Sequence, residues 1–269
     1  MTDSYVMGRN SAETQRLQVQ ANLLAPHTAH LFRLAGVSPG MRVLDIGCGA
    51  GDVSMLLAEL VGPAGSVIGV DVDPVVLDLA RTRAAEAGLT TVSFVHADLT
   101  ELQLDEPVDA LVGRLILMHL REPAATVRTL SRLVRSGGVV SFQDYVLSRT
   151  RAVPATPLVT RTVRWVVEAM RAGGANPDIG EQIASILSDA GLSVLGAAST
   201  GAGGGADSVV PELFAATARS VLPTALAHGV VAETDVDIDG LAGQLARELK
   251  EASALGWPPE LVAAWARVR

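Results

Sequence analysis

The sequence, 269 residues long, predicts a doubly wound α/β fold in which helices cover both faces of a mostly parallel sheet. Short apolar runs rich in β-branched residues are typical of buried parallel strands, and they alternate with helical patterns in the first half of the chain. The clearest run, Val43–Ile46, ends abruptly in glycines at alternate positions, Gly47, Gly49 and Gly51. A helical pattern begins at about Val53. Strand, glycine turn and helix together predict a nucleotide-type cofactor site at the carboxyl edge of the sheet.

A glycine turn of this kind suits a ligand for two physical reasons. Glycine has no Cβ, so it allows positive φ and lets a ligand lie directly against the backbone. The amides at the start of the following helix offer unpaired donors and a positive dipole end to an anionic group. A purely structural turn remains the alternative, because glycine-rich turns follow many strands.

The spacing of the glycines indicates which nucleotide is bound. A dinucleotide fingerprint needs Gly-x-Gly-x-x-Gly or Ala, whereas here Asp52 occupies the third small position and Gly51 comes one residue early. A carboxylate at that position would repel a pyrophosphate. The pattern Asp-x-Gly-x-Gly-x-Gly, which begins at Asp45, instead resembles the S-adenosylmethionine loop of the class I methyltransferases. That cofactor has no phosphate, and its sulfonium cation and zwitterionic methionine end tolerate nearby carboxylates.

The resemblance continues over about residues 1–145 and implies S-adenosylmethionine as cofactor and S-adenosylhomocysteine as product. Asp71 ends the second predicted strand, about 20 residues past the glycine loop, where an acidic side chain can accept hydrogen bonds from ribose hydroxyls. Asp73 precedes Pro74 and is better explained as a helix N-cap. The resemblance implies that Asp98 accepts from the adenine amine, the alternative being a surface turn residue. The cofactor-binding residues expected in this way are Tyr5, Gln20, Asp45, Gly47, Cys48, Gly49, Gly51, Asp71, Val72, Asp98, Leu99 and Arg114.

The amino-terminal segment precedes the predicted sheet. Ser11 fits a helix start, and Pro26 suits the first turn of a second helix. Residues 5–20 resemble the amino-terminal segment of a small-molecule subgroup of the family, where it folds over the cofactor pocket. Tyr5 and Gln20 are therefore candidates to touch the cofactor, and a solvated amphipathic helix face is the alternative reading.

Two histidines, His119 and His27, are the candidate catalytic residues. In relatives the segment Arg114–Leu120 crosses the carboxyl edge of the sheet beneath the transferable methyl group, so Arg114 could face the methionine end of the cofactor. His119 is placed there as a general base, with an intrinsic pKa in the useful range. A buried structural histidine is the alternative, because the surrounding run is apolar. His27 and His30 lie three residues apart, a poor metal site without further ligands, and no metal is expected.

The second half of the chain is expected to set substrate specificity. Thr156–Ala172 resembles the family's lid helix over the substrate pocket, although its apolar face could equally pack on the sheet. A sixth strand is expected at Leu192–Ala197 and a flexible link at Ser199–Ala206. Leu261–Ala266 resembles the family's seventh strand, which returns antiparallel at the sheet edge. The resemblance thus implies a Rossmann-like methyltransferase fold with a seven-stranded, mostly parallel sheet and a helical lid. The expected domains are an amino-terminal cap at 1–37, the cofactor-binding core at 38–150, the lid at 151–177, and the rest of the core at 178–269 with inserted helices at 208–256.

Composition limits the partners and the compartment. A net charge of −8, a pI near 5.1 and 3% aromatic residues disfavour nucleic acid, which needs clustered cations or stacking platforms. The single cysteine, Cys48, excludes an internal disulfide and fits a reducing cytosol; we interpret it as a small packing residue, with a reactive thiol as the alternative. No apolar run approaches the roughly 20 residues that span a bilayer. A cytoplasmic protein without a membrane partner is expected, and the inserted helices could pair two copies into a homodimer.

The sequence therefore favours an enzyme that moves the methyl group of S-adenosylmethionine to an O, N, S or C nucleophile of a small, largely apolar molecule, such as a specialised metabolite in biosynthesis. The alternative is a scaffold that keeps the cofactor site but performs other chemistry, as a cyclase, decarboxylase or ligand-binding module, because fold does not fix chemistry. A nicotinamide-dependent oxidoreductase is disfavoured by Asp52.

Overall fold

A computed structural model describes the backbone of residues 11–269 and the side chains from Leu23 onward. The chain forms two compact units. The first, called here the sheet unit, comprises Leu24–Asp144, Gly180–Ala198 and Val262–Arg269. The second, called here the helical unit, comprises Tyr145–Ile179, Ser199–Leu261 and the described part of Met1–Leu23.

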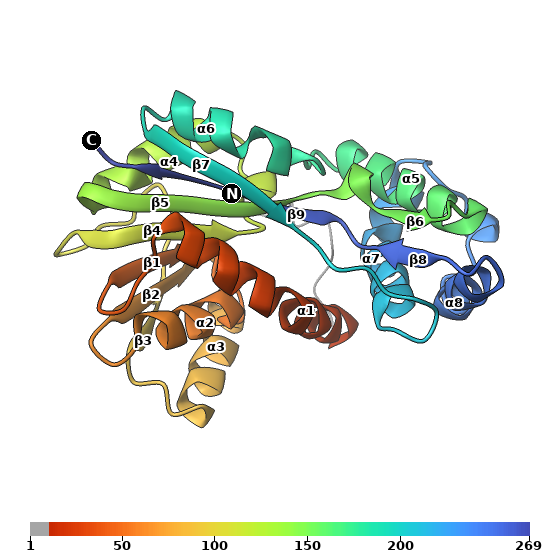
Figure 1. The fold of residues 1–269 in the computed structure, drawn as a ribbon, viewed down its shortest axis with the longest axis horizontal. Helices are drawn as coiled ribbons and strands as arrows, with labels where there is room; N and C mark the ends of the chain where they lie inside the picture. Colours follow the sequence, from red (N-terminus) through yellow and green to blue (C-terminus); the bar gives the residue numbers. More distant parts are fainter. Residues whose placement is uncertain (1–10) are drawn as a thin grey trace. The chain divides into compact units, whose positions relative to one another are not determined.

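The seven strands of the main sheet follow the order β3-β2-β1-β4-β5-β9-β7 (Figure 1). β1 pairs in parallel with β2 and with β4, β2 pairs in parallel with β3, and β4 pairs in parallel with β5. The chain moves outward from β1 to β3 and then crosses to β4 on the other side of β1. This reversal is a topological switch point, and ligands of doubly wound sheets bind outside the carboxyl ends of the strands there. The bounds are β1 Arg42–Ile46, β2 Ser66–Asp71, β3 Val92–His96, β4 Val108–Arg114, β5 Val134–Val146, β7 Ser193–Thr200 and β9 Glu260–Arg267.

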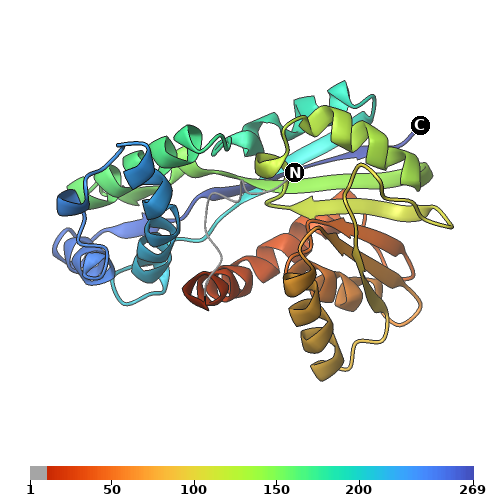
Figure 2. The same cartoon turned by 180° about the vertical axis from the view of Figure 1, so that it is seen from behind.

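The core of the sheet unit forms because apolar residues recur at strand and helix periods. Val43 of β1, Ala110 of β4 and Val139 of β5 are register partners across the sheet and are fully buried. α2 presents Val53 and Leu57, one turn apart, to the same cluster. Figure 2 shows the helices of this unit from behind. Their bounds are α1 Ser11–Ala35, which belongs to this unit from Leu24 onward, α2 Asp52–Val61, α3 Pro74–Glu86, α4 Pro123–Leu130 and α6 Ile183–Asp189, with short 3₁₀ turns η1 Leu117–His119, η2 Ser131–Leu133 and η4 Ile179–Gln182, the last of which belongs to this unit from Gly180 onward.

The helical unit is built on three helices that pack in series, α5 on α7 and α7 on α8. The amino end of α5 is held by Glu248 of α8, whose carboxylate accepts hydrogen bonds from the backbone amides of Leu158 (2.8 Å) and Val159 (3.3 Å). Thr156, at the N-cap position, has a buried hydroxyl without a partner among the described residues. The bounds are α5 Pro157–Ala172, α7 Val210–Ala227, α8 Leu241–Glu251, η3 Leu147–Arg149 and η5 Glu233–Asp235, with an antiparallel pair of strands, β6 Arg151–Val153 and β8 Leu255–Trp257.

The predicted seven-stranded, mostly parallel fold is confirmed, and four details differ. α1 continues through Pro26 as one helix instead of two, since a proline inside a helix removes one hydrogen bond but need not end it. β9 lies between β5 and β7, so β7 is the edge strand. Gly204 lies in the expected flexible link, but its amide and carbonyl pair with those of Gly256, both at 2.9 Å. The short strands β6 and β8 were not predicted. In the part of the chain that the structure describes, no helix has the length and apolar character to cross a membrane.

Candidate cofactor site

The glycine loop after β1 adopts backbone angles that favour glycine. Gly47 has φ +65°, and a Cβ there would lie 2.5 Å from Cδ1 of Ile116, so a side chain would clash as well as strain the turn. Gly49 has φ +52°, and a Cβ there would meet nothing within 4 Å. Gly49 is therefore required for its conformation only, and it leaves an open face above the backbone. That open face is the approach a ligand needs.

Asp71 joins the end of β2 to this loop. Its Oδ2 accepts a hydrogen bond of 2.9 Å from the amide of Gly49, and its Oδ1 accepts one of 3.0 Å from the amide of Asp73. Each carboxylate oxygen has a second lone pair, so both can still accept from hydroxyl groups. Asp73 caps α3, accepting from the amide of Val75 at 2.9 Å with Pro74 at the first helical position. Asp71 therefore contacts the glycine loop, whereas Asp73 caps a helix, as the sequence predicted for Asp73.

Asp45 is a buried carboxyl beneath the loop. Its side chain is almost fully buried, and its Oδ2 accepts a hydrogen bond of 2.6 Å from Oγ of Ser54 in α2. Burial raises the pKa of Asp45 to about 7, although the Ser54 bond and the charge of Arg114 oppose the shift. The nearby carboxylates of Asp71 and Asp52 add to it. The charge of this side chain therefore changes near neutral pH.

Asp52, which occupies the third small position of a dinucleotide fingerprint, is paired with a cation. Nη2 of Arg83 in α3 lies 2.6 Å from its Oδ1, and Nη1 of the same guanidinium donates to the carbonyl of Ala50, also at 2.6 Å. The Arg83 guanidinium partly neutralises the carboxylate and fixes the loop to α3. Repulsion by Asp52 is thus a weaker argument against a pyrophosphate than the sequence suggested, and the displaced position of Gly51 is the stronger one.

The turn after β3 contains Asp98. Its Oδ1 accepts hydrogen bonds from the amide (2.8 Å) and hydroxyl (2.7 Å) of Thr100, and these bonds lower the pKa of Asp98. The ring of His96 contacts the carbonyl of Val72 at 3.0 Å, which fits a structural role for this histidine. Val72 is more than half exposed and Leu99 is half-buried, so both lie near the surface at this edge.

A buried polar cluster connects the ends of β4 and β5 to α1. Arg114 and Gln143 are register partners on adjacent strands. Nη1 of Arg114 donates to the hydroxyl of Thr28 at 3.1 Å, and Nε2 of Gln143 donates to the carbonyl of Thr28 at 3.2 Å. Thr28 and Gln143 are fully buried, and Oε1 of Gln143 has no partner among the described residues. Sequence reasoning missed both residues; the polar side chain of Gln143 within the strand pattern Val139–Val146 marks that residue, but not its contact with Thr28.

His119 is the last residue of the 3₁₀ turn η1, which follows Arg114 of this cluster in the sequence. Burial lowers the pKa of His119 to about 4, so the imidazole is neutral at pH 7. A group with that pKa is a weak general base, because it holds a proton poorly at neutral pH. The amide of Met118 donates to Oδ2 of the buried Asp144 at 3.4 Å, which ties η1 to β5. His27 is half-buried in α1, directly before Thr28.

Two expected cofactor contacts cannot be located. Tyr5 lies outside the described residues, and Gln20 lies in α1 with its side chain outside them. Cys48 is buried, and burial raises the pKa of its thiol, so the thiol stays protonated and acts as a packing residue. Among the described residues no group of three histidine, cysteine or acidic side chains could hold a metal ion.

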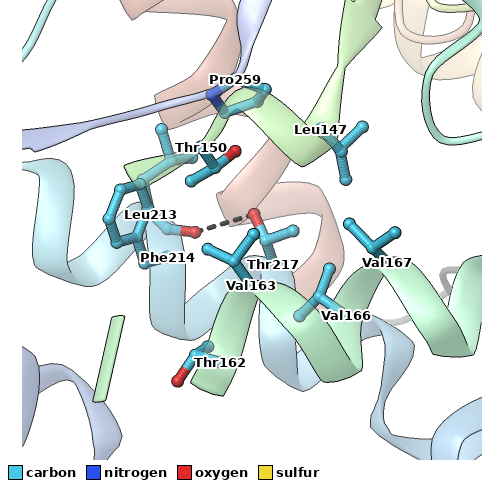
Figure 3. Close-up of a pocket in the computed structure, with 10 residues that line it drawn as sticks. All are labelled: Leu147, Thr150, Thr162, Val163, Val166, Val167, Leu213, Phe214, Thr217 and Pro259. Carbon is cyan, nitrogen blue, oxygen red and sulfur yellow. Dashed lines mark hydrogen bonds between the residues drawn. The ribbon is translucent and has the colours of Figure 1, made fainter. Parts of the chain in front are cut away.

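The helical unit contains a separate cavity of about 40 Å³ between α5 and α7 (Figure 3). Most of its walls are apolar. The hydroxyl of Thr217 donates to the carbonyl of Leu213 at 2.8 Å, the bond that is dashed in Figure 3. The lining residues are Leu147, Thr150, Thr162, Val163, Val166, Val167, Leu213, Phe214, Thr217 and Pro259.

Comparison with known proteins gives consistent results. A family model described as a methyltransferase domain matches residues 37–184. The ubiquinone/menaquinone biosynthesis C-methyltransferase of Ectopseudomonas mendocina is 31% identical over 132 residues, which are 48% of this chain and 49% of the relative. The chain thus matches about half the length of that relative.

Two solved structures share the fold over most of the chain. A geranyl diphosphate methyltransferase in complex with S-adenosylmethionine has a TM-score of 0.57 at 13% identity, covering 97% of this chain and 92% of its own. The 4+2 cyclase SpnF has a TM-score of 0.53 at 22% identity, covering 91% and 81%. At these identities the likeness shows the fold alone. The family match, together with the glycine loop at the switch point, shows that the chain belongs to the methyltransferase-domain family, with the fold of the class I S-adenosylmethionine-dependent enzymes.

Proposed function

We propose that the chain binds S-adenosylmethionine and transfers its methyl group to an O, N, S or C nucleophile of a small molecule. The observation that carries the proposal is the pairing of the Asp71 carboxylate with the open glycine loop at the switch point of the sheet. The residues present fit this cofactor. Gly49 leaves room against the backbone, and Asp71 keeps acceptor capacity for two ribose hydroxyls.

Four parts of the site would hold the cofactor. Asp71 would bind the ribose, and the free oxygen of Asp98 would accept from the adenine amine while Leu99 offers its amide. The loop Gly47–Gly51 would lie along the methionine portion. Arg114, fixed by Thr28, would supply a cation for the methionine carboxylate, since a guanidinium is well suited to bind a carboxylate through two hydrogen bonds.

When bound, S-adenosylmethionine supplies an electrophilic methyl group on a sulfonium centre. The contribution of the chain is mainly positioning, since holding two reactants in line can supply about 7–11 kcal/mol of effective molarity. A base is needed only where the nucleophile must lose a proton. His119 is neutral but weakly basic at pH 7, so it would accept a proton from such a nucleophile poorly.

A largely apolar acceptor is the substrate class we propose. The names of two similar proteins point that way, one in ubiquinone and menaquinone biosynthesis and one acting on geranyl diphosphate. The acidic composition, with a net charge of −8, also disfavours a nucleic acid acceptor. Cytoplasmic location and pairing into a homodimer stay predictions.

A second candidate function is non-methylating chemistry on the same cofactor scaffold. It is supported by the likeness to the 4+2 cyclase and by the weak basicity of His119. Incubation with methyl-labelled S-adenosylmethionine and a panel of quinols, phenols, amines and prenylated compounds separates the two functions. Methyl transfer predicts label in an acceptor and an equal amount of S-adenosylhomocysteine. Acceptor conversion without S-adenosylhomocysteine would favour the second function and contradict the first.

A further inference from the structure

Thr28 of α1 is a fully buried polar residue that contacts two neighbouring strands within the sheet unit. Its hydroxyl accepts a hydrogen bond of 3.1 Å from Nη1 of Arg114, the last residue of β4. Its carbonyl accepts one of 3.2 Å from Nε2 of Gln143 in β5. Arg114 and Gln143 are register partners on these parallel strands. One residue of α1 therefore contacts two polar side chains at the carboxyl edge of the sheet.

The contact with Gln143 holds α1 against the strands without using the hydroxyl of Thr28. A backbone carbonyl can only accept, so the amide nitrogen of Gln143 must face Thr28. The Gln143 side chain is fully buried, and its backbone carbonyl accepts a hydrogen bond of 2.8 Å from the amide of Leu115, the residue after Arg114. The Thr28 hydroxyl can therefore be removed while the contact of α1 with β5 stays in place.

Arg114, in contrast to Thr28, is only half-buried. Burial raises the pKa of Asp45 and the charge of Arg114 opposes that rise, so the guanidinium lies close to the carboxyl beneath the glycine loop. A guanidinium has five N–H donors in a planar fork, and the bond to Thr28 uses one of them. A long side chain loses much rotational freedom when a ligand orders it. A hydroxyl that orders the side chain beforehand reduces that cost of binding.

We propose that Thr28 is a positioning residue that sets the selectivity of the cofactor site for a carboxylate-bearing ligand. Its hydroxyl holds the Arg114 guanidinium in the orientation that binds the methionine carboxylate of the cofactor. The inference rests on the proposed function for the identity of the ligand, and on the two hydrogen bonds of Thr28 for the way the residue acts. Thr28 acts through Arg114, and its role requires no contact with the cofactor.

Calorimetry of the full chain with two ligands tests this role. S-adenosylhomocysteine carries the carboxylate, and its decarboxylated analogue lacks that group alone. Thr28→Val replaces the hydroxyl by a methyl group of similar size. It should weaken binding of S-adenosylhomocysteine about three- to tenfold and change binding of the analogue by less than about twofold. Thr28→Ser keeps the hydroxyl and should bind both ligands within about twofold of wild type.

The comparison of ligands separates positioning from support of the fold. A residue that only supports the fold does not distinguish the two ligands by their carboxylate. Equal weakening of both ligands in Thr28→Val, or unchanged binding of both, would therefore overturn the inference. Thr28→Ala removes the same hydroxyl and replaces Thr28→Val in the comparison if the valine variant does not fold.

A double-mutant cycle tests whether Thr28 acts through Arg114. In the Arg114→Ala background, Thr28→Val should have little further effect on S-adenosylhomocysteine binding, because the group that it positions is gone. An equal loss in both backgrounds would contradict the proposal. Thr82→Val is the matched control: it removes the hydroxyl of an exposed threonine of α3, which donates to the carbonyl of Asp78 at 2.9 Å, and it should leave both affinities unchanged.

A carboxyl ¹³C NMR titration of Asp45 reports on the Arg114 guanidinium without any ligand. If the Thr28 hydroxyl holds the guanidinium near Asp45, Thr28→Val should raise the pKa of Asp45 by at least about 0.3 units. An unchanged pKa would show that Arg114 keeps its place without Thr28, and would overturn the inference.

The same measurements distinguish this inference from the proposed function. Absence of binding of either ligand by folded wild-type protein would overturn the proposed function, while the Asp45 titration would still report whether Thr28 holds Arg114. Binding of both ligands with equal affinity by the wild type would overturn the selectivity inferred here and leave the cofactor site standing.

Discussion

The Asp71 carboxylate accepts a hydrogen bond of 2.9 Å from the amide of Gly49, so one side chain connects the end of β2 to the glycine loop that follows β1. The two residues are 22 apart in sequence. Their contact fixes the loop in a left-handed conformation with one open face, while the carboxylate keeps lone pairs for a ligand. The loop conformation and the proposed binding of the cofactor ribose therefore depend on the same side chain.

The buried carboxyl of Asp45 predicts a stability difference that grows with pH. Its pKa rises from 3.8 to about 7 on folding, so between those values the folded state binds more protons than the unfolded state, and its contribution to stability falls as pH rises. Asp45→Asn keeps an acceptor for Ser54 and removes this titration. We expect the free energy of unfolding of the variant, relative to wild type, to increase by up to about 4 kcal/mol between about pH 4 and 7.

Urea denaturation of both proteins across this pH range measures the difference. Comparing the two proteins cancels the titration of all other groups. A difference that stays constant with pH would show that Asp45 titrates at its ordinary value, and would contradict the burial argument.

The ion pair between Arg83 and Asp52 predicts unequal effects for two neighbouring arginines. Arg83→Ala removes a pair that is mostly buried and a bond to the carbonyl of Ala50, so it should cost about 1–2 kcal/mol of stability. Arg81→Ala removes a largely exposed pair with Asp78 on the same helix and an exposed hydrogen bond of 3.1 Å to the carbonyl of Phe94, and it should cost less than about 0.5 kcal/mol. Hydrogen exchange should show faster opening of the glycine loop in Arg83→Ala only. Equal costs for the two variants would show that Arg83 does not hold the loop.

Glu248 caps the amino end of α5 from another helix, and Thr156 is expected to take over this role when the Glu248 carboxylate is removed. Glu248→Ala frees the amides of Leu158 and Val159 and should cost about 1 kcal/mol, a typical loss for a helix cap. Thr156 sits at the N-cap in an extended conformation with an unpartnered hydroxyl, so it can replace the lost carboxylate. Thr156→Val alone should therefore be nearly neutral, yet it should cost about 1 kcal/mol more in the Glu248→Ala background.

A double-mutant cycle by thermal or urea unfolding measures this coupling. Glu251→Ala, an exposed acid on the same helix, is the matched control and should change little. Additive effects of the Thr156 and Glu248 substitutions would mean that the hydroxyl does not take over the amides.

The half-buried imidazole of His119 predicts a proton affinity well below that of a free histidine. Its pKa of about 4 means that it stays neutral down to acidic pH, while the unfolded chain takes up a proton at about 6.5. Stability should therefore fall as the pH drops from about 6.5 towards 4. A proton NMR titration, with His119→Asn to assign the ring signal, should place the midpoint near 4. A midpoint near 6.5 would instead support the general-base role expected from the sequence.

The sequence predicted those parts of the site that depend on local chemistry. The glycine loop, the acid at the end of β2 and the Asp73 cap follow from short patterns in which each residue acts on its immediate neighbours. The continuation of α1 through Pro26 was missed because a local helix-breaking rule was overridden by the packing of the helix.

Contacts between distant parts of the chain were not predictable from one sequence. Gln143 and Thr28 are 115 residues apart, and Glu248 lies 90 residues from the amide of Leu158. Neither contact leaves a local signal, because it depends on which elements pack together. The cavity in the helical unit was likewise hidden, since the apolar face of α5 has the same periodicity whether it packs fully or leaves a space.

The most direct test of the account is calorimetric titration of S-adenosylmethionine into wild-type protein and the Asp71→Ala variant. We expect saturable binding by the wild type and an affinity lower by about 1–3 kcal/mol in the variant, because the ribose loses a charged acceptor and the loop loses its tie. Asp73→Ala, which removes only the cap of α3, should bind nearly as tightly as wild type. Absence of binding by a folded wild-type protein, or equal binding by wild type and Asp71→Ala, would contradict the proposed cofactor site.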